Sequence, residues 1–387
     1  MIKEAQKPKI LIVDDIPQNI RLLEMNLKPE GYNIIAAYSG QEALEKVAVE
    51  KPDLILLDIM MPGMDGYEVC KRLRQNRETR ALPVVMITAS EKDMDKKIEA
   101  LDVGADDFIT KPFDRYEVLA RVRSLLRVKS LHDELVRAKN MLEEELDMAR
   151  EVQQGFMPSE YPSIPGLDFS HRYFPTFAVG GDFFDVNELS PGVVEIFMSD
   201  VMGHGPQAAM ITGVIKTLLT QLSSSLAGPD YLLSQINERF HSLMASGGLP
   251  IFVTAFCMII DTVNNRCVYS NAGHPAPFLI QDRHSQAEEL VIEPGPALGM
   301  ISNTIYEISE RELGSGDMLF FYTDGLSELM NRNRVQFGAA ELQRAILHNT
   351  HLAPHAFIEA IMCAADAFAE GLVSSDDITL LAVSYNP

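Results

Sequence analysis

The first 125 residues of the chain alternate short apolar runs with amphipathic segments of helical periodicity. The apolar runs, rich in Val, Ile and Leu, occupy residues 10–13, 33–36, 54–57, 84–88 and 107–110. Strands of continuous apolar character separated by helices are typical of a parallel sheet that is covered on both faces. The pattern predicts an α/β domain with a five-stranded parallel sheet, in which polar residues directly after the strands are candidates for a binding site.

Between Asp114 and Gly155 the chain contains neither proline nor glycine, so we expect one helix to run through this segment. A 4-3 spacing of apolar side chains from Leu131 to Val152 is interrupted only at Glu145. This stripe predicts a short coiled coil, and we favour a parallel homodimer. The alternative is an amphipathic helix that packs on its own domain.

After residue 158 the pattern changes to strands with inserted helices. Strands are expected at 168–174, 182–187, 193–199, 253–260, 266–270, 318–323 and 378–383, with helices after 205 and 229 and two between 338 and 370. This order predicts an α+β domain in which two sheets pack face to face and helices flank them. We therefore expect a first domain at 1–125, a helical coiled-coil linker at 126–157 and a second domain at 158–387.

The composition is that of a protein with a substantial core, because 47% of the 387 residues are hydrophobic and 23% are charged. The formal net charge of −22 argues against nucleic acid as a direct partner, since binding a phosphate backbone needs a basic surface. No apolar stretch reaches the roughly 18 residues of a membrane span, and the N-terminal run is too short for a signal peptide. We expect a cytoplasmic protein without a membrane partner, whose four cysteines are free thiols in the core.

Polar side chains follow the strands of the first domain at one edge of the expected sheet. They are Asp14 and Asp15 after the first strand, Asp58 and Thr88 at the ends of the third and fourth, and Lys111 after the fifth. Adjacent carboxylates repel one another unless a cation lies between them, and oxygen ligands suit Mg²⁺. Asp58 is then a candidate nucleophile toward a phosphoryl group. Thr88 could donate a hydrogen bond to the phosphoryl oxygens, and Lys111 could pair with them.

The motifs LIVDD, LLDIMMPGMDGYE, MITAS and FITKPF resemble those of the receiver domains of bacterial response regulators, over residues 8–127. The resemblance implies a flavodoxin-like fold that a sensor histidine kinase phosphorylates on Asp58. It also implies that Mg²⁺ is bound by acidic side chains and one backbone group, namely those of Asp14, Asp15, Asp58 and Met60. The peptide bond before Pro112 is expected to be cis. Phe108 falls at the position of the aromatic switch residue, and the alternative is a phenylalanine of the core.

Acidic residues in the second domain also stand at strand ends or beside small residues: Asp182, Asp185, Asp200, Asp324, Asp376 and Asp377. Carboxylates that clustered without a cationic partner would be costly, and divalent metals would relieve that cost. Ligation by oxygen alone favours Mg²⁺ or Mn²⁺ over zinc. Two such ions can hold a bridging hydroxide and orient a phosphate for in-line displacement.

The segments VGGDFFD, SDVMGHG, NAGHPAP, FYTDGLSE and DDITLLAV resemble the PPM (PP2C-type) phosphatases, within them the SpoIIE/RsbU-like branch of bacterial serine phosphatases. The resemblance covers residues 145–387 and implies four metal ligands: Asp182, Asp200, Asp324 and Asp376. It favours Asp376 over Asp377 as the ligand, and Asp377 would cap or support the site. Position 201 has no assigned role, and Asp185 is a secondary candidate.

Two further parts of this resemblance concern loops. Asn271 and His274 belong to a family signature in which the histidine either stabilises a loop or contacts the substrate. Gly181 and Gly325 would let the backbone approach the metals. No arginine adjoins the VGGD segment, so we expect the metals to bind most of the substrate phosphate.

The sequence thus predicts a response regulator with a Mn²⁺- or Mg²⁺-dependent serine/threonine phosphatase as its output, regulated by phosphorylation of Asp58. By resemblance, the expected substrate is a phosphorylated STAS-type anti-anti-sigma protein in a partner-switching pathway. The alternative is a pseudophosphatase that binds a protein partner to sequester or deliver it. A DNA-binding output is disfavoured by the acidic charge.

Overall fold

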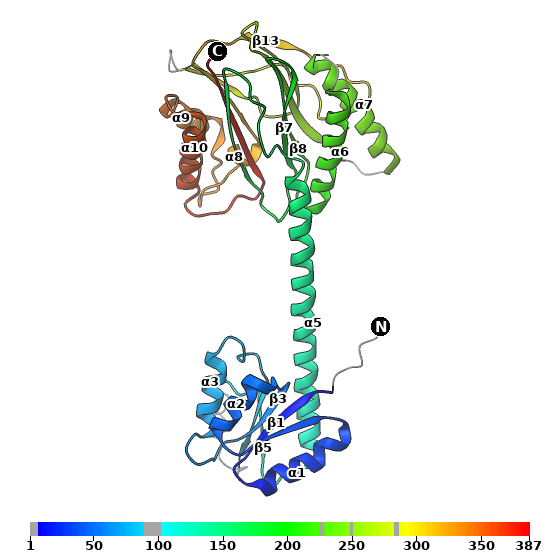
Figure 1. Cartoon of the computed structure of the whole chain (residues 1–387), viewed down its shortest axis with the longest axis vertical. Coiled ribbons are helices and arrows are strands. Elements are labelled where there is room, and N and C mark those ends of the chain that lie inside the picture. The colour runs from blue at the N-terminus through cyan, green and yellow to red at the C-terminus, as the bar shows by residue number, and fades with distance from the viewer. Residues whose placement is uncertain (1–6, 89–101, 224–227, 248–250, 282–285) are drawn as a thin grey trace. The chain divides into compact units, whose positions relative to one another are not determined.

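The computed structural model describes residues 7–88, 102–223, 228–247, 251–281 and 286–387. The chain divides into two compact units, Met1–Leu142 and Glu143–Pro387 (Figure 1). Within the described residues, no helix has the length and apolar character needed to cross a membrane.

The first unit is built on a parallel sheet of five strands in the order β2-β1-β3-β4-β5. The strands are β1 (Lys9–Val13), β2 (Asn33–Ala37), β3 (Leu54–Asp58), β4 (Val84–Thr88) and β5 (Asp107–Thr110). The helices are α1 (Pro17–Leu27), the 3-10 turn η1 (Lys28–Glu30), α2 (Gly40–Glu50), α3 (Gly66–Gln75) and the first part of α5 (Arg115–Gln154). Asp65 begins α3 by accepting a hydrogen bond from the Glu68 amide. All five strands were predicted from their apolar runs.

Alternate residues of these strands face two apolar cores, one on each side of the sheet. Leu11 and Val13 of β1 pack with α2 and α3, whereas Ile10 and Ile12 pack with α1 and α5. A sheet covered on both faces explains why its strands are apolar throughout. The carboxyl ends of the strands are the edge at which polar side chains remain.

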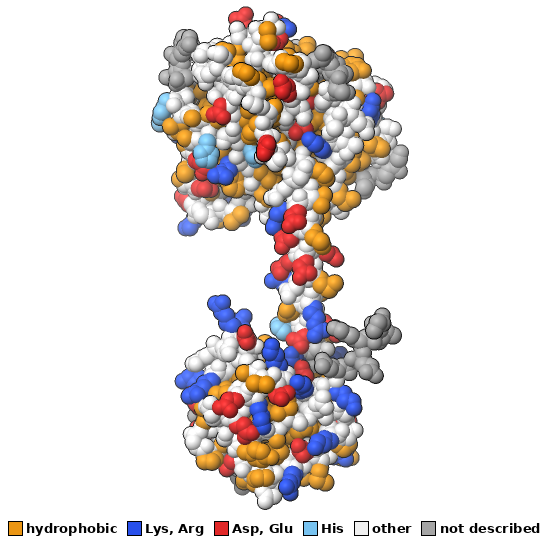
Figure 2. All heavy atoms as spheres, in the orientation of Figure 1, with side chains coloured by type: hydrophobic (Ala, Val, Ile, Leu, Met, Phe, Trp, Pro, Cys, Tyr) orange, Lys and Arg blue, Asp and Glu red, His pale blue; other side chains and the backbone are white. Residues whose placement is uncertain are grey.

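Helix α5 runs without a break from Arg115 to Gln154, as the absence of proline and glycine predicted. Its first turns are buried in the core of the first unit through Val118, Leu119 and Val122. The apolar stripe that follows is exposed, with Leu135 69% accessible, and hydrophobic side chains are visible along this surface (Figure 2). The stripe therefore does not pack on its own domain within the described chain.

The second unit is a sandwich of two antiparallel sheets, ordered β13-β10-β9-β8-β7 and β12-β11-β14-β15-β6. The first sheet contains β7 (Asp182–Ser190), β8 (Val193–Val201), β9 (Val253–Asp261), β10 (Arg266–Ala272) and β13 (Ser309–Glu312). The second contains β6 (Leu167–Phe174), β11 (Phe278–Gln281), β12 (Gln286–Glu289), β14 (Asp317–Tyr322) and β15 (Ile378–Tyr385). Phe184, Phe256 and Phe321 belong to the core between the sheets.

Helices cover the outer face of each sheet. They are α6 (Pro206–Leu222) and α7 (Pro229–Gly247) on the first sheet, and α9 (Gly338–His348) and α10 (Pro354–Ala369) on the second. Gly205, with φ of 77°, precedes α6 and Pro206 occupies its first turn. The α+β sandwich with flanking helices was predicted, whereas β11, β12, β13 and the short α8 (Asp324–Ser327) were not. Three cysteines are buried as expected, but Cys363 is exposed on the outer surface of α10.

Candidate functional site

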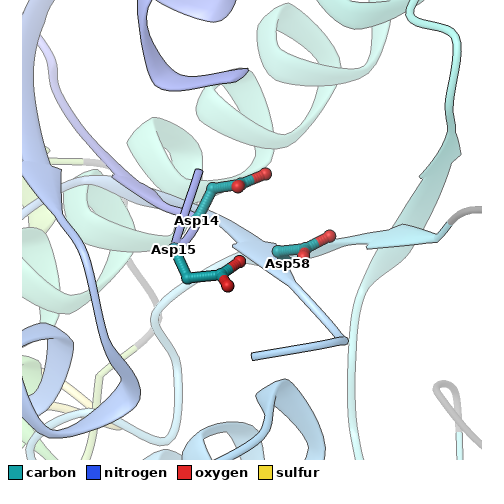
Figure 3. Close-up of side chains that lie close together, drawn as sticks. All are labelled: Asp14, Asp15 and Asp58. Atoms are coloured by element: carbon teal, nitrogen blue, oxygen red, sulfur yellow. The ribbon is translucent and has the colours of Figure 1, made fainter. Parts of the chain in front are cut away.

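Three carboxylates meet at the carboxyl edge of the parallel sheet (Figure 3). Asp14 follows β1, Asp15 is the next residue, and Asp58 ends β3. One oxygen from each lies within 4.8 Å of the others, and Asp14 and Asp58 are buried. No other group of three acidic, His or Cys residues in the part of the chain that the structure describes is this close. The cluster fits one hard cation such as Mg²⁺.

Lys111 joins this cluster from the loop after β5. Its Nζ lies 3.0 Å from Asp14 Oδ2 and 2.8 Å from Asp58 Oδ1, and the bond between Lys111 and Pro112 is cis, as the resemblance implied. Burial raises the pKa of Asp58, and Lys111 offsets this only in part. Burial alone would lower the pKa of Lys111, but hydrogen bonds to Asp58 and Asp14 raise it instead. A charged ammonium is thus held where a phosphoryl group on Asp58 would need one.

Asn19 of α1 holds Asp14 in place, although nothing in the sequence analysis pointed to it. Its Nδ2 lies 3.0 and 2.9 Å from the two carboxylate oxygens of Asp14, and the Ile16 amide donates to Oδ1 at 2.9 Å. These donors orient Asp14 toward the edge of the sheet. An asparagine in the first turn of a helix that directly follows the acid pair was the available signal.

The remaining residues predicted for the receiver site take up the expected positions in the fold. Thr88 ends β4 and is 4% exposed, and its neighbour Ile87 pairs with Asp58. Phe108 is half-buried on β5, with the Arg121 guanidinium 5.6 Å from its ring centroid. The Met60 side chain is exposed, so a role for this residue rests on its backbone. The last two residues of the MITAS motif, at positions 89 and 90, lie outside the described residues.

The acidic residues of the second unit come together at one end of the sandwich. Asp182 begins β7 and pairs directly with Asp200, near the end of β8. Asp324 follows β14 and Asp376 precedes β15, which are neighbours in the other sheet. The charges of Asp324 and Asp376 both act on Asp200. Residues from four separated segments, two in each sheet, therefore form one acidic site.

Asp182 is fixed by two threonines of the opposite sheet. Its Oδ2 accepts hydrogen bonds from Thr323 Oγ1 at 2.7 Å and from Thr379 Oγ1 at 2.6 Å. Burial, and then the neighbouring Asp200, raise the pKa of Asp182 well above its ordinary range. Both threonines lie inside the motifs FYTDG and DDIT, but sequence analysis did not assign them a role.

Burial and neighbouring carboxylates also raise the pKa values of Asp200 and Asp324. Burial, followed by Asp324 and Asp376, raises the pKa of Asp200 to about 8. Burial and Asp376 raise the pKa of Asp324 to about 6. No Lys, Arg or His of the described chain is among the largest causes of these pKa shifts. An acidic site of this kind without a cationic side chain fits divalent cations.

Asp376 and Asp377 have different surroundings. Asp377 is 2% exposed, and its two oxygens accept from the amides of Thr176 at 2.7 Å and Gly181 at 2.6 Å. Asp376 is more accessible and accepts at Oδ1 from the Asp377 amide at 2.9 Å. Asp377 therefore supports the loop that leads to Asp182, and Asp376 is the better candidate ligand.

Asp185 lies away from the acidic site. Side chains alternate along a strand, so Asp185 and Asp182 project from opposite faces of β7. Asp185 is buried under α6, where Lys216 Nζ lies 2.7 Å from its Oδ2. The residue forms a partly buried ion pair between helix and sheet.

His274 stabilises a loop in this structure. Its amide donates to Asn271 Oδ1 at 2.8 Å, Asn271 Nδ2 donates to the His274 carbonyl at 2.9 Å, and His274 Nδ1 lies 2.9 Å from Thr254 Oγ1. Burial lowers the pKa of His274 to about 3, so the ring is neutral. Position 201 is occupied by Val201, which is buried in the core beneath α6.

Two glycines permit close backbone contacts around the acids. A Cβ on Gly181 would lie 2.8 Å from the Val201 carbonyl oxygen. A Cβ on Gly325 would lie 2.0 Å from the Asp377 carbonyl oxygen. The glycines are therefore required for packing of the loops that carry the acids.

The two folds and their sites define a receiver domain joined to a PP2C-type phosphatase domain. The family model for the response regulator receiver domain matches residues 10–123. The family model for Stage II sporulation protein E (SpoIIE) matches residues 190–386, more than half of the 387 residues. The chain belongs to the SpoIIE family.

Solved structures share the fold of the second unit. The SiaA-PP2C domain of Pseudomonas aeruginosa superposes with a TM-score of 0.58 at 18% identity, covering 64% of this chain and 99% of that one. The RsbU and RsbW domains of Rv1364c from Mycobacterium tuberculosis give a TM-score of 0.50 at 26% identity, covering 60% of this chain and 63% of that one.

Curated relatives match the receiver region. The response regulator PleD of Caulobacter vibrioides is 51% identical over 127 residues, which are 33% of this chain and 28% of PleD. The alkaline phosphatase synthesis transcriptional regulatory protein PhoP of Bacillus subtilis is 50% identical over 119 residues, 31% of this chain and 48% of PhoP. The chain thus spans less than half the length of these relatives.

Proposed function

We propose that this protein is a response regulator whose second unit is a Mn²⁺- or Mg²⁺-dependent protein serine/threonine phosphatase. The observation that carries the proposal is the acidic site of Asp182, Asp200, Asp324 and Asp376. The carboxylates of Asp182, Asp200 and Asp324 have raised pKa values, and no cationic side chain of the described chain is among the largest causes of these shifts. Divalent ions bound there would supply the missing positive charge and an activated water for attack on phosphorus.

The side chains around the site would give it a fixed geometry. Thr323 and Thr379 both donate to the same oxygen of Asp182, which sets the orientation of its carboxylate. Asp377 ties the Gly181 amide to the loop before β15, so segments of both sheets are joined beside the ligands. Such preorganisation lets ligands and substrate meet without rearrangement at the moment of reaction.

The receiver would control this activity through Asp58. A carboxylate oxygen of Asp58 would attack the phosphoryl group on a histidine of the sensor kinase, so that a P–O bond forms and the P–N bond breaks. Asp14 and Asp15 would hold Mg²⁺, and Lys111, 2.8 Å from Asp58 Oδ1, would pair with the new phosphoryl oxygens. Thr88 at the same edge would donate to one of them.

The proposed substrate is a phosphorylated STAS-type anti-anti-sigma protein. The proposal rests on the SpoIIE family match. We also propose a homodimer through α5, since Leu131, Leu135 and Leu142 are exposed at the spacing of a coiled-coil seam. Sedimentation analysis of the full chain should give a dimer, and a strict monomer with and without beryllofluoride would refute this part.

The test of the activity is phosphate release. The full chain is incubated with Mn²⁺ and a panel of phosphorylated STAS proteins from the same genome. Release of phosphate that EDTA abolishes would support the proposal. Tight binding of a STAS protein without release would instead identify a pseudophosphatase that sequesters its partner.

A further inference from the structure

One glutamine near the end of α5 is buried. Gln153 is 4% exposed, whereas Val152 and Gln154 beside it are exposed. Its Oε1 accepts from the Gly180 amide at 3.1 Å, and its Nε2 donates to the Gly180 carbonyl at 2.6 Å. Nε2 also lies 3.3 Å from Thr212 Oγ1 of α6. Both halves of one side-chain amide thus bind the backbone of one residue, which requires an acceptor and a donor together.

Gly180 begins the segment that leads into the acidic site. The next residue, Gly181, donates its amide to Asp377 at 2.6 Å, and the one after it is Asp182, held by two threonines. Arg150, one turn earlier on α5, donates from Nε to the Ala178 carbonyl at 2.8 Å. Helix α5 therefore binds the backbone of residues 178–180, directly ahead of the proposed metal ligand.

The backbone at Gly180 is closely packed against its neighbours. A Cβ on Gly180 would lie 2.3 Å from Asp377 Oδ2 and 2.5 Å from the Tyr173 hydroxyl. A ring atom of Phe156, just beyond α5, would lie 3.2 Å from a Cβ on Gly213 of α6. In such close packing, a shift of Gly180 must displace its neighbours as well.

Helix α5 is anchored at both of its ends. Val118 and Val122 are buried in the core of the first unit, and Gln153 is hydrogen-bonded to the Gly180 backbone of the second. The helix between them is continuous, so a displacement or rotation of its last turn acts on Gly180 through two hydrogen bonds. These bonds form a physical connection between the helix and the metal-binding loop.

We propose that Gln153 is a positioning residue for the metal site, through which α5 sets the place of Asp182. The proposal rests on the proposed function, since it assumes that Asp182 binds a metal. Gln153 touches neither metal nor substrate in this role. It acts on the backbone two residues before the ligand, so its loss should weaken metal binding while the remaining ligands stay in place.

The test uses the full chain and four variants. Gln153→Met keeps a side chain of similar length but removes the amide, and Gln154→Met makes the same change on the exposed neighbour. Thr212→Val removes the third partner of Gln153 and leaves both bonds to Gly180. Arg150→Gln removes the other contact with the segment. Mn²⁺ affinity is measured by titration calorimetry without substrate, and thermal unfolding in EDTA reports the fold.

Gln153→Met should weaken Mn²⁺ binding by about 10- to 100-fold, the usual effect of losing a group that orients a ligand. Gln154→Met and Thr212→Val should stay near the wild-type value, within about twofold. Wild-type affinity in a folded Gln153→Met would overturn the proposal. Equal weakening by Thr212→Val would overturn it too, because general loosening between α5 and α6 would then explain the effect.

Two further outcomes are decisive. If Gln153→Met does not fold, Arg150→Gln decides, since the Arg150 side chain is 43% exposed and its removal leaves the core intact. Weakening of about threefold or more by Arg150→Gln supports the proposal, and unchanged affinity overturns it. If the wild type itself binds no Mn²⁺, the proposed function fails first and this inference fails with it, a result distinct from failure in the variant alone.

Discussion

Replacing Asp200 by asparagine should stabilise the metal-free phosphatase unit at neutral pH while abolishing its activity. Burial and the charges of Asp324 and Asp376 raise the pKa of Asp200 to about 8, from an ordinary value of 3.8. Between these two values the folded protein holds a proton that the unfolded chain has released. The free energy of unfolding therefore falls as pH rises through this window, and the loss is complete only above about pH 8.

The size of the effect follows from proton linkage. A difference of one bound proton changes the free energy of unfolding by about 1.4 kcal/mol per pH unit. Asp182 and Asp200 interact and Asp200 retains some solvent contact, so we take about 1 kcal/mol per pH unit for Asp200. For a unit of this size, that corresponds to about 2 to 4 °C in Tm per pH unit.

The assay is calorimetric unfolding of the full chain in EDTA at several pH values from 6 to 8. The Tm of the wild-type phosphatase unit should fall as pH rises. The Tm of Asp200→Asn should fall less steeply, by about 2 to 4 °C per pH unit. Asp185→Asn is the matched control, because it removes a buried aspartate of β7 that is paired with Lys216. It leaves Lys216, whose side chain is 29% exposed, without its partner. It should lower Tm at every pH, through a loss of about 1 to 3 kcal/mol in the free energy of unfolding.

Parallel profiles for the wild type and Asp200→Asn would refute the reasoning. They would mean that the charge of Asp200 is already compensated in the metal-free protein. The acidic site would then not require a divalent cation.

Three further predictions concern the metals and the receiver. Mn²⁺ should bind more tightly as pH rises from 6 to 8, because at lower pH it must displace protons from Asp324, with a pKa of about 6, and Asp200, with a pKa of about 8. The number of protons released on binding should therefore fall as pH rises. Calorimetry in buffers of different ionisation enthalpy measures this number, and a Mn²⁺ affinity that does not change with pH would contradict the prediction. Acetyl phosphate with Mg²⁺ should label the wild type and not Asp58→Asn, and an acid-stable label on the variant would place the phosphate elsewhere. Beryllofluoride, which mimics the phosphoryl group, should raise the phosphatase rate. A flexible Gly-Ser insertion after Lys139 should remove this response but keep the basal rate. If the insertion variant still responds to beryllofluoride, the signal does not travel along α5.

Most of the strands that the sequence predicted contain buried apolar residues, although β6 is only partly buried and the short buried run of β11 (FLIQ) was missed. β3 (LILLD) and β14 (DMLFFY) are buried at every position, and such runs are recognisable without any tertiary information. β12 (QAEE) and β13 (SERE) escaped prediction because they are short, charged strands at the outer edges of their sheets. Their pairing depends on a neighbouring strand and not on their own sequence.

The acidic residues of both sites could be predicted because they lie in compact motifs, but their supporting partners could not. Thr323 and Thr379 are 141 and 197 residues away from Asp182, and Gln153 is 27 residues from Gly180. A hydroxyl or amide far away in sequence gives no sign of which carboxylate or backbone group it will meet. The separation of Asp185 from Asp182 is different, since strand alternation in VGGDFFD already places these residues on opposite faces.

The central claim is that carboxylates of both sheets hold divalent metal ions for hydrolysis of a phosphoprotein. The most direct test is the rate of phosphate release from a phosphorylated STAS protein by the wild type, Asp324→Asn and Asp185→Asn at saturating Mn²⁺. We predict metal-dependent turnover for the wild type, turnover for folded Asp185→Asn, and at least about a hundredfold loss for Asp324→Asn, on the scale expected when a catalytic charge is removed. Wild-type turnover by Asp324→Asn, or phosphate release that persists in EDTA, would contradict the account.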